Sequence, residues 1–372
     1  MHLAPWLANP HRSPGGAAPR DADSAAVRSF HPSLPGYRET PLVPLPRLAE
    51  ELGVRAVLVK DESSRLGLPA FKMLGASWAV YRALAERCDP VPAPDLETLR
   101  TALAGSSPVR LVTATDGNHG RAVARMGTLL DLPVTVVVPR GVSETAVALI
   151  RGEGCEVQVL DLSYDDAVRH AADLSAADPS GLLVQDTSWP GYEDVPQWIV
   201  DGYATLFSEA AEQAEELGLR FDAMFVPVGV GSLAHAAVQF VATRPAPCDV
   251  VAVEPDTAAC VQASLATGEL TSVDTATTVM AGLNCGTPSY LAWPDLAAGL
   301  SGCVTVTDDQ AAAAMDELAA AGVDSGACGA ASLAALRTLA SLGEDRGGLA
   351  MGRDSAVLLL NTEGRAKQPD DR

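Results

Sequence analysis

The sequence lacks several features that would assign it to particular classes of protein. Its seven cysteines are scattered, with no CxxC pair and no cysteine–histidine spacing that suits a metal. We therefore expect reduced thiols and no metal site. No apolar run follows a basic start at the N-terminus, so no signal peptide is predicted. The longest apolar runs, such as VTVVV and AVLLLL, are too short to span a bilayer. These absences favour a cytoplasmic protein without a membrane partner.

Positive charge is also scarce. The chain has 26 lysines and arginines against 47 aspartates and glutamates, and a net charge of −21 at pH 7. Such a surface repels nucleic acid and anionic lipid, so we expect a small-molecule ligand as the partner. An anionic cofactor would then rely on local donors, for which backbone N–H groups at helix N-termini are the obvious source.

Short apolar runs alternate with alanine-rich helical stretches along most of the 372 residues. Because the runs are apolar throughout, helices should cover both faces of the sheets, which predicts an α/β fold with mostly parallel strands. Residues 1–28 and 365–372 read as a flexible arm and tail, and 88–108 as a surface insertion. The predicted strands are RAVLVK (55–60), VRLVTA (109–114), VTVVVP (134–139), EVQVLD (156–161), LLVQD (182–186), DAMFVPV (222–228), DVVAVE (249–254) and SAVLLLN (355–361).

The first candidate for chemistry is the segment KDESSRLGLPAFKMLGASWA (60–79). Lys72 stands between Phe71 and Met73, just before a predicted helix. Partial desolvation there would lower the pKa of the lysine and favour the free amine that carbonyl chemistry needs. The alternative is a lysine at a helix edge whose charged head reaches water.

The second candidate is the turn TATDGNHGRAVA (113–124), between a predicted strand and helix. Gly117 and Gly120 allow a tight turn, and the helix start suits an anion or carboxylate. Asn118 offers a donor and an acceptor, and Asp116 is a potential general base. The alternative is a capped turn in which Asp116 and Asn118 only satisfy backbone amides. His119 can equally be a hydrogen-bonded structural histidine.

The third candidate is VPVGVGSLAHAAV (226–238), again a strand, a glycine loop and a helix. Successive N–H groups here could cradle a phosphate. The same segment fits GxGxxA, with Glu254 ending the next strand, which is typical of a nicotinamide or flavin dinucleotide site. That alternative leaves the Lys72 and Asp116 segments unexplained. The residues of the predicted phosphate loop are Gly229, Val230, Gly231, Ser232 and Leu233.

The fourth candidate is VLLLNTEG (357–364), a buried strand that ends next to Thr362. A hydroxyl at a strand end can hydrogen-bond a neutral heterocyclic nitrogen. The alternative is an ordinary strand-to-loop turn.

Taken together and in order, these segments resemble the fold type II family of pyridoxal 5′-phosphate (PLP) enzymes. This group includes threonine and serine dehydratases and tryptophan synthase β, and the chain looks most like its diaminopropionate ammonia-lyases. The likeness is collinear from FHPSLPGYRETPL (30–42) to NTEG (361–364). The segment WPGYEDVPQWIVDGYATL (189–206) is the most discriminating, since dehydratases do not usually carry it.

The resemblance implies two three-layer αβα domains with the cofactor between them. The large PLP-binding domain would comprise 29–80 and 190–364, and the small α/β domain 81–189. The family also implies a homodimer.

The resemblance further implies a role for each matching residue. Lys72, next to Phe71 in the cofactor site, resembles the Schiff-base lysine, and Asn118 the residue that touches the PLP phenolate oxygen. The loop from Gly229 to Leu233 resembles the phosphate loop, and Thr362 the partner of the pyridine nitrogen.

For the substrate, the family implies that Asp116 is the base for one enantiomer and the lysine for the other. Asp186, in QDTSW, resembles a second active-site aspartate. Gly117 and His119 complete the predicted substrate site. A reversible disulfide between Cys260 and Cys285 is an option, with free thiols expected in a reducing compartment.

The implied reaction removes ammonia from 2,3-diaminopropionate and yields pyruvate and a second ammonia. The substrate's β-ammonium group is positive, so two carboxylates are a sensible recognition device. The chain departs from the family pattern at Pro69 before AFK, at NCGTP (284–288) and at its end. The first two departures concern the pocket, and so the substrate more than the cofactor. The alternatives are a serine or threonine dehydratase-like deaminase, another β-eliminating lyase, a non-catalytic amino-acid sensor and, more remotely, a dinucleotide-dependent oxidoreductase.

Overall fold

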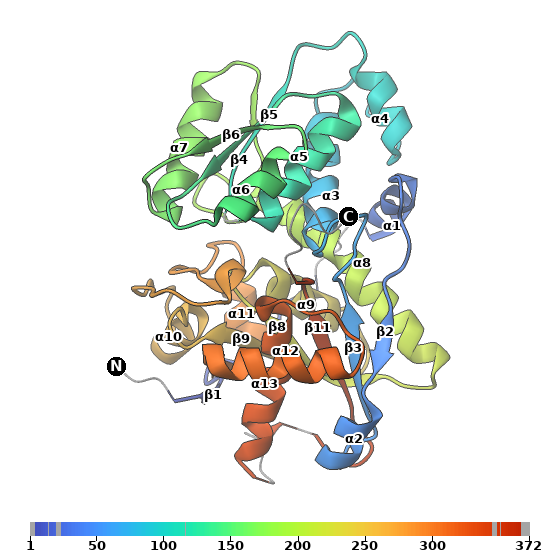
Figure 1. Cartoon of the computed structure of the whole chain (residues 1–372). Coiled ribbons are helices and arrows are strands. Elements are labelled where there is room, and N and C mark those ends of the chain that lie inside the picture. The colour runs from blue at the N-terminus through green and yellow to red at the C-terminus, as the bar shows by residue number, and fades with distance from the viewer. Residues whose placement is uncertain are drawn as a thin grey trace. The chain divides into compact units, whose positions relative to one another are not determined.

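The computed structural model describes residues 4–13, 15–19, 24–115, 117–343, 348–349 and 351–365. The described residues form two units, each built on its own sheet (Figure 1). The first unit takes its residues from the ranges 1–22, 39–64 and 204–365, and the second from 23–38 and 65–203. No helix in the described part of the chain is both long and apolar enough to cross a membrane.

The first unit contains a seven-stranded sheet in the order β1-β10-β9-β8-β11-β3-β2. The five inner strands pair in parallel, and β1 and β2 pair antiparallel at the two edges. The strands are β1 (Trp6–Ala8), β2 (Leu42–Pro44), β3 (Ala56–Asp61), β8 (Phe221–Pro227), β9 (Asp249–Pro255), β10 (Gly302–Val306) and β11 (Ala356–Asn361).

Helices cover this sheet and bury its central strands. Alternate strand residues such as Phe225, Val253 and Leu359 join a core cluster with residues of α2, α12 and α13. Every residue of β11 is buried, as expected for a parallel strand covered on both faces. The helices are α2 (Pro46–Leu52), α9 (Ser232–Ala242), α10 (Cys260–Thr267), η2 (Ala281–Leu283), α11 (Trp293–Gly299), α12 (Asp308–Ala320) and α13 (Ala327–Ser341), while α8 (Asp194–Glu216) contains residues of both units.

The second unit contains a four-stranded parallel sheet in the order β6-β5-β4-β7. Helix α7 packs on β4, β5 and β7, and α5 packs on β4 and β5. The strands are β4 (Arg110–Ala114), β5 (Val134–Val138), β6 (Glu156–Val159) and β7 (Gly181–Leu183). The helices are α1 (Ser24–Phe30), η1 (His31–Ser33), α3 (Lys72–Ala85), α4 (Leu96–Leu103), α5 (Asn118–Leu130), α6 (Glu144–Arg151) and α7 (Tyr164–Ala177).

The predicted α/β class is confirmed, and all eight predicted strands are present. The N-terminal arm needs a correction, because β1 adds a strand to the edge of a sheet. Trp6 packs there against Gly302, at which a Cβ would meet the indole ring. The insertion 88–108 contains the helix α4. Residues 366–372 of the predicted tail lie outside the described residues.

The two units differ in extent from the predicted domains. The structure groups 29–38, 65–80 and 190–203 with the second unit, whereas the sequence placed them in the large domain. The reason is packing: α3, which contains most of 65–80, lies against α4 and α5 of the second unit.

Parallel pairing places the carboxyl ends of neighbouring strands at the same edge of a sheet. In the first unit, β8 pairs with β11, so the glycine loop after β8 and Thr362 after β11 share one edge. In the second unit, β4 pairs with β7, so the turn after Ala114 and the segment that contains Asp186 share one edge. These carboxyl edges are where open α/β sheets bind ligands.

Candidate active site

Lys72 is the first residue of α3, and its side chain is 23% exposed. Its Nζ lies 5.5 Å from the ring centroid of Phe71, which is itself buried. The Phe71 ring contacts the ring of Tyr203, with 4.8 Å between centroids. Lys72 therefore stands beside an aromatic wall with its amine only partly open to water, as the sequence predicted.

A tight turn leads into this lysine. The backbone N–H groups of Arg65 and Leu68 each donate to the other's carbonyl, at 2.9 Å. The two residues between them have left-handed backbones, with φ of 53° at Leu66 and 75° at Gly67. This is the pattern of a type I′ turn, in which leucine is an unfavourable residue. Arg125 of α5 donates to the carbonyl of Leu66 at 3.5 Å, so the turn is tied to the helix that opens at Asn118.

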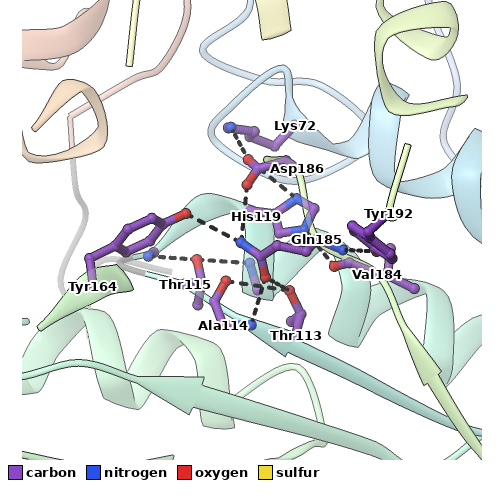
Figure 2. Close-up of polar contacts among 12 residues, drawn as sticks. Lys72, Thr113, Ala114, Thr115, His119, Tyr164, Val184, Gln185, Asp186 and Tyr192 are labelled. Carbon is purple, nitrogen blue, oxygen red and sulfur yellow. Dashed lines mark hydrogen bonds and ion pairs between the residues drawn. The ribbon is translucent and has the colours of Figure 1, made fainter. Parts of the chain in front are cut away.

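Lys72 is paired with Asp186. Its Nζ lies 2.5 Å from Oδ2 of Asp186, which is 4% exposed (Figure 2). Burial alone would raise the pKa of this carboxyl, but the charge of His119 in its protonated form and the Lys72 ammonium outweigh burial and hold the pKa at about 2. Asp186 is therefore a carboxylate at neutral pH.

His119 lies on the other side of the same carboxylate. It belongs to the first turn of α5, and its Nε2 donates to the carbonyl of Val184 at 2.9 Å. Its Nδ1 lies 3.7 Å from Oδ2 of Asp186. Burial lowers the pKa of His119, more than the neighbouring carboxylate raises it. The imidazole is therefore neutral while Lys72 carries its charge.

Gln185 holds the second oxygen of Asp186, and sequence reasoning missed it. Its Nε2 donates to Asp186 Oδ1 and to the hydroxyl of Tyr164, both at 3.3 Å. Its Oε1 accepts from the N–H of Ala114 at 3.0 Å and from the hydroxyl of Thr113 at 3.2 Å. Figure 2 shows this amide between the end of β4 and the carboxylate. Its place next to Asp186 in the sequence was the available signal.

The turn after β4 is organised by Thr115, which sequence reasoning also missed. The Thr115 hydroxyl accepts from the N–H groups of Gly117 at 2.9 Å and Gly120 at 3.1 Å. Asn118 is the first residue of α5, with Gly117 at the N-cap. Thr115 thus satisfies two backbone amides of this turn. Asp116 lies outside the described residues.

The glycine loop of the first unit has the form of an anion cradle. Gly231, with φ of 99°, is the N-cap of α9 and has no side chain to cap it. A Cβ at Gly229 would lie 3.0 Å from the carbonyl oxygen of Gly282 and 3.1 Å from Sγ of Cys285. Close packing therefore favours glycine at both positions, and a helix that starts at an N-cap without a side chain is typical of an anion site. Thr362 is 4% exposed, directly after β11.

Glu254 is not placed as a ribose-binding acid. It is fully buried, and its two oxygens accept from the N–H groups of Val261 and Gln262, each at 2.8 Å. Its carboxyl group therefore caps α10, which removes the feature that supported a dinucleotide site. Cys260 and Cys285 are free thiols, as are the other five cysteines.

Within the second unit the structure brings together Lys72, His119 and Asp186, with Phe71, Gly117 and Asn118 beside them in the sequence. The described residues hold no cluster of metal-ligating side chains. A partly buried amine in contact with a buried carboxylate and imidazole can exchange protons with a bound molecule.

Comparison with known proteins agrees with this chemistry. The family model described as pyridoxal-phosphate dependent enzyme matches residues 33–362. Diaminopropionate ammonia-lyase of Escherichia coli (strain K12) is 36% identical over 367 residues, or 94% of this chain and 91% of that protein.

Two crystal structures of the Escherichia coli enzyme each cover 97% of this chain. One, with an aminoacrylate-PLP azomethine reaction intermediate, has a TM-score of 0.84, 33% identity and 94% of its own chain covered. The other, an apo form, has a TM-score of 0.81, 31% identity and 93% covered. The chain therefore belongs to the family of pyridoxal-phosphate dependent enzymes and, within it, to the diaminopropionate ammonia-lyases.

Proposed function

We propose that this chain removes the β-amino group of 2,3-diaminopropionate as ammonia, after which one water hydrolyses the product to pyruvate and a second ammonia. The observation that carries the proposal is the buried contact of Lys72 with Asp186, in a chain 36% identical to a diaminopropionate ammonia-lyase. The contact supplies both an amine for carbonyl chemistry and a carboxylate for a cationic leaving group.

The residues present fit PLP. The ε-amine of Lys72 would hold the cofactor covalently, beside Phe71. The start of α9, where Gly229 and Gly231 leave no room for side chains, suits its phosphate group. When bound, PLP acts as the electron sink for the reaction. In the same proposal Asn118 would hold the ring oxygen of the cofactor and Thr362 its ring nitrogen. The complete loop comprises Gly229, Val230, Gly231, Ser232 and Leu233.

The chain's own residues divide the remaining work. The substrate carboxylate would be held at Gly117, where α5 begins with a glycine N-cap. The α-proton would be removed by the Lys72 amine for one enantiomer and by Asp116 for the other. Asp186 would face the β-ammonium group, because its low pKa keeps it ionised over the physiological range. A hydroxyl leaving group has no charge for this carboxylate to recognise, which favours diaminopropionate over serine or threonine.

The test combines a visible spectrum with product assays. Purified protein with PLP should show the absorption band of lysine-bound cofactor and form pyruvate and ammonia from 2,3-diaminopropionate. Lys72→Ala should lose the band. Products from serine or threonine, with none from diaminopropionate, would replace the proposal with a dehydratase. A band that persists in Lys72→Ala would refute the assigned lysine. If no PLP binds, the proposal fails altogether.

We also propose a cytoplasmic homodimer. The seven free thiols support a reducing compartment, and dimers are the commonest state of soluble oligomers. Sedimentation of the purified protein should give twice the mass of one chain, and a monomer mass would refute the dimer.

A further inference from the structure

The ring of His119 has a fixed orientation and one nitrogen without a partner. Nε2 must carry a hydrogen, because the Val184 carbonyl can only accept one. In the neutral ring, Nδ1 therefore has a lone pair. Nδ1 is buried and has no hydrogen-bond partner among the described residues. It lies 3.7 Å from Oδ2 of Asp186 (Figure 2).

This arrangement places two electron-rich atoms next to each other. A lone pair that faces a carboxylate oxygen is tolerable while the Lys72 ammonium, 2.5 Å from the same oxygen, neutralises the charge. If Lys72 becomes a neutral amine, the buried carboxylate of Asp186 loses the cation that lies 2.5 Å from its Oδ2, which is costly. A proton on Nδ1 of His119 would place a cation beside Asp186 again, because Nδ1 already lies 3.7 Å from Oδ2 of Asp186.

We propose that His119 is the proton store of Asp186. When the ammonium of Lys72 gives up its proton, a proton is held on Nδ1 of His119, and Asp186 stays ionised. Lys72 goes from charge +1 to 0, His119 goes from 0 to +1, and the net charge of the three groups does not change. His119 is thus a positioning residue that keeps Asp186 anionic while Lys72 acts as a free amine.

The other groups around the three residues do not supply this charge. Burial raises the pKa values of Tyr192 and Tyr203, so both hydroxyls stay neutral. Gln185, which contacts Asp186 Oδ1, does not titrate. Arg121, on the same helix as His119, is paired with Glu153 at 2.9 Å. Among the described residues, the charges that act on His119 are those of Asp186 and Lys72. Asp116 lies outside them and is covered by a variant below.

Only the part that this charge coupling plays in catalysis rests on the proposed function of Lys72. The coupling itself is a property of the cofactor-free chain. A homologous apo form exists as a crystal structure, so this state is accessible. A chain that fails to react with diaminopropionate could still show the coupling, and the reverse also holds. The two proposals can therefore fail separately.

The test is an NMR titration of imidazole ¹⁵N shifts in the full-length, cofactor-free protein. The His119 signal is the one missing in His119→Gln. We expect Lys72→Met to raise the titration midpoint of His119 by at least about one pH unit, since a cation near it is lost. Lys72→Arg is the matched control and should keep the midpoint near that of the wild type. Asp186→Asn should lower it, and the ¹⁵N shifts should show the new proton on Nδ1.

An unchanged midpoint in Lys72→Met would overturn the proposal, as would equal shifts in Lys72→Met and Lys72→Arg. Repeating Lys72→Met in a chain that also has Asp116→Asn decides whether Asp116 causes the shift of the His119 midpoint. A shift that disappears in this background would assign the store to Asp116 and contradict the proposal. If Lys72→Met does not fold, Asp186→Asn decides: a midpoint equal to or above the wild-type value excludes coupling.

Discussion

Gly202 of α8 packs directly on Gly75 of α3. A Cβ on Gly202 would lie 2.6 Å from the carbonyl oxygen of Leu74 and 2.9 Å from the Cα of Gly75. Gly75 is three residues after Lys72 on the same helix, so this contact fixes the helix end that carries the lysine.

Substitution of Gly202 by alanine should therefore lower stability and disturb Lys72. Backbone atoms cannot move aside as a flexible side chain can, so we expect a loss of about 1–3 kcal/mol in the free energy of unfolding. Chemical denaturation measures the loss, and the cofactor band reports on the lysine. Gly152→Ala is the control, because its Cβ would meet atoms no closer than 3.4 Å. Equal stability of the two variants would contradict the packing argument.

Gln185→Leu should weaken catalysis through Asp186. The change removes the donor to Asp186 Oδ1 and the acceptor of the Ala114 N–H. Lost hydrogen bonds to a charged group predict a drop in kcat/KM of roughly tenfold or more. A carboxylate that loses a donor has a higher pKa, so the acid limb of the pH–rate profile should move to higher pH. Gln158→Leu, which removes an exposed hydrogen bond, should change neither value.

Glu254 should make the stability depend on pH. Burial, against its backbone hydrogen bonds, raises its pKa from 4.5 to about 7. Between these values the folded chain keeps a proton that the unfolded chain releases, so stability is greatest below pH 4.5 and falls as pH rises towards 7. The shift corresponds to roughly 3 kcal/mol. Urea midpoints at several pH values should lose this part of their slope in Glu254→Gln. Glu269→Gln, an exposed change, should keep the wild-type slope.

Gly231→Ala should weaken the binding of PLP. A Cβ there would lie 2.8 Å from Cδ1 of Leu296, at a φ of 99° that disfavours alanine. Both effects displace the start of α9, so we expect at least about a tenfold loss of affinity in an absorbance titration with PLP. Gly36→Ala has a similar left-handed φ of 78° but no atom within 4 Å. It controls for backbone strain, and an equal loss of affinity there would exclude a specific role for the loop.

The hydrophobic pattern of the sequence predicted eight of the strands. Parallel strands covered on both faces are continuous apolar runs, and each of the eight predicted segments contains a strand, although the edge strand β6 has no buried residue. Strands β1 and β2 were missed because prolines interrupt their short apolar runs: Pro5 precedes β1, and Pro41 and Pro44 bound β2. In β10, glycine and threonine interrupt the apolar run. Composition alone could not show that Trp6 packs on Gly302 and orders part of the N-terminal arm.

The same limit applies to the site. Lys72 stood out because a charged residue between apolar neighbours is unusual, and Asp186 was found through the family resemblance; the structure places them in contact. Gln185 and Thr115 did not stand out, since an amide or hydroxyl acquires its role from partners that folding brings close. For Gln185 these partners are the N–H of Ala114 and the hydroxyl of Tyr164, both distant in the sequence.

The turn before Lys72 bears on attempts to engineer this protein. A left-handed leucine costs about 1 kcal/mol, and an asparagine or glycine at position 66 would remove that cost. Leu66 is 5% exposed, however, and burial of a leucine side chain contributes roughly 2 kcal/mol. Because burial of the side chain outweighs the backbone cost, selection for heat resistance should leave this position alone. A consensus rule for hairpin turns would choose Asn-Gly here and lower the melting temperature.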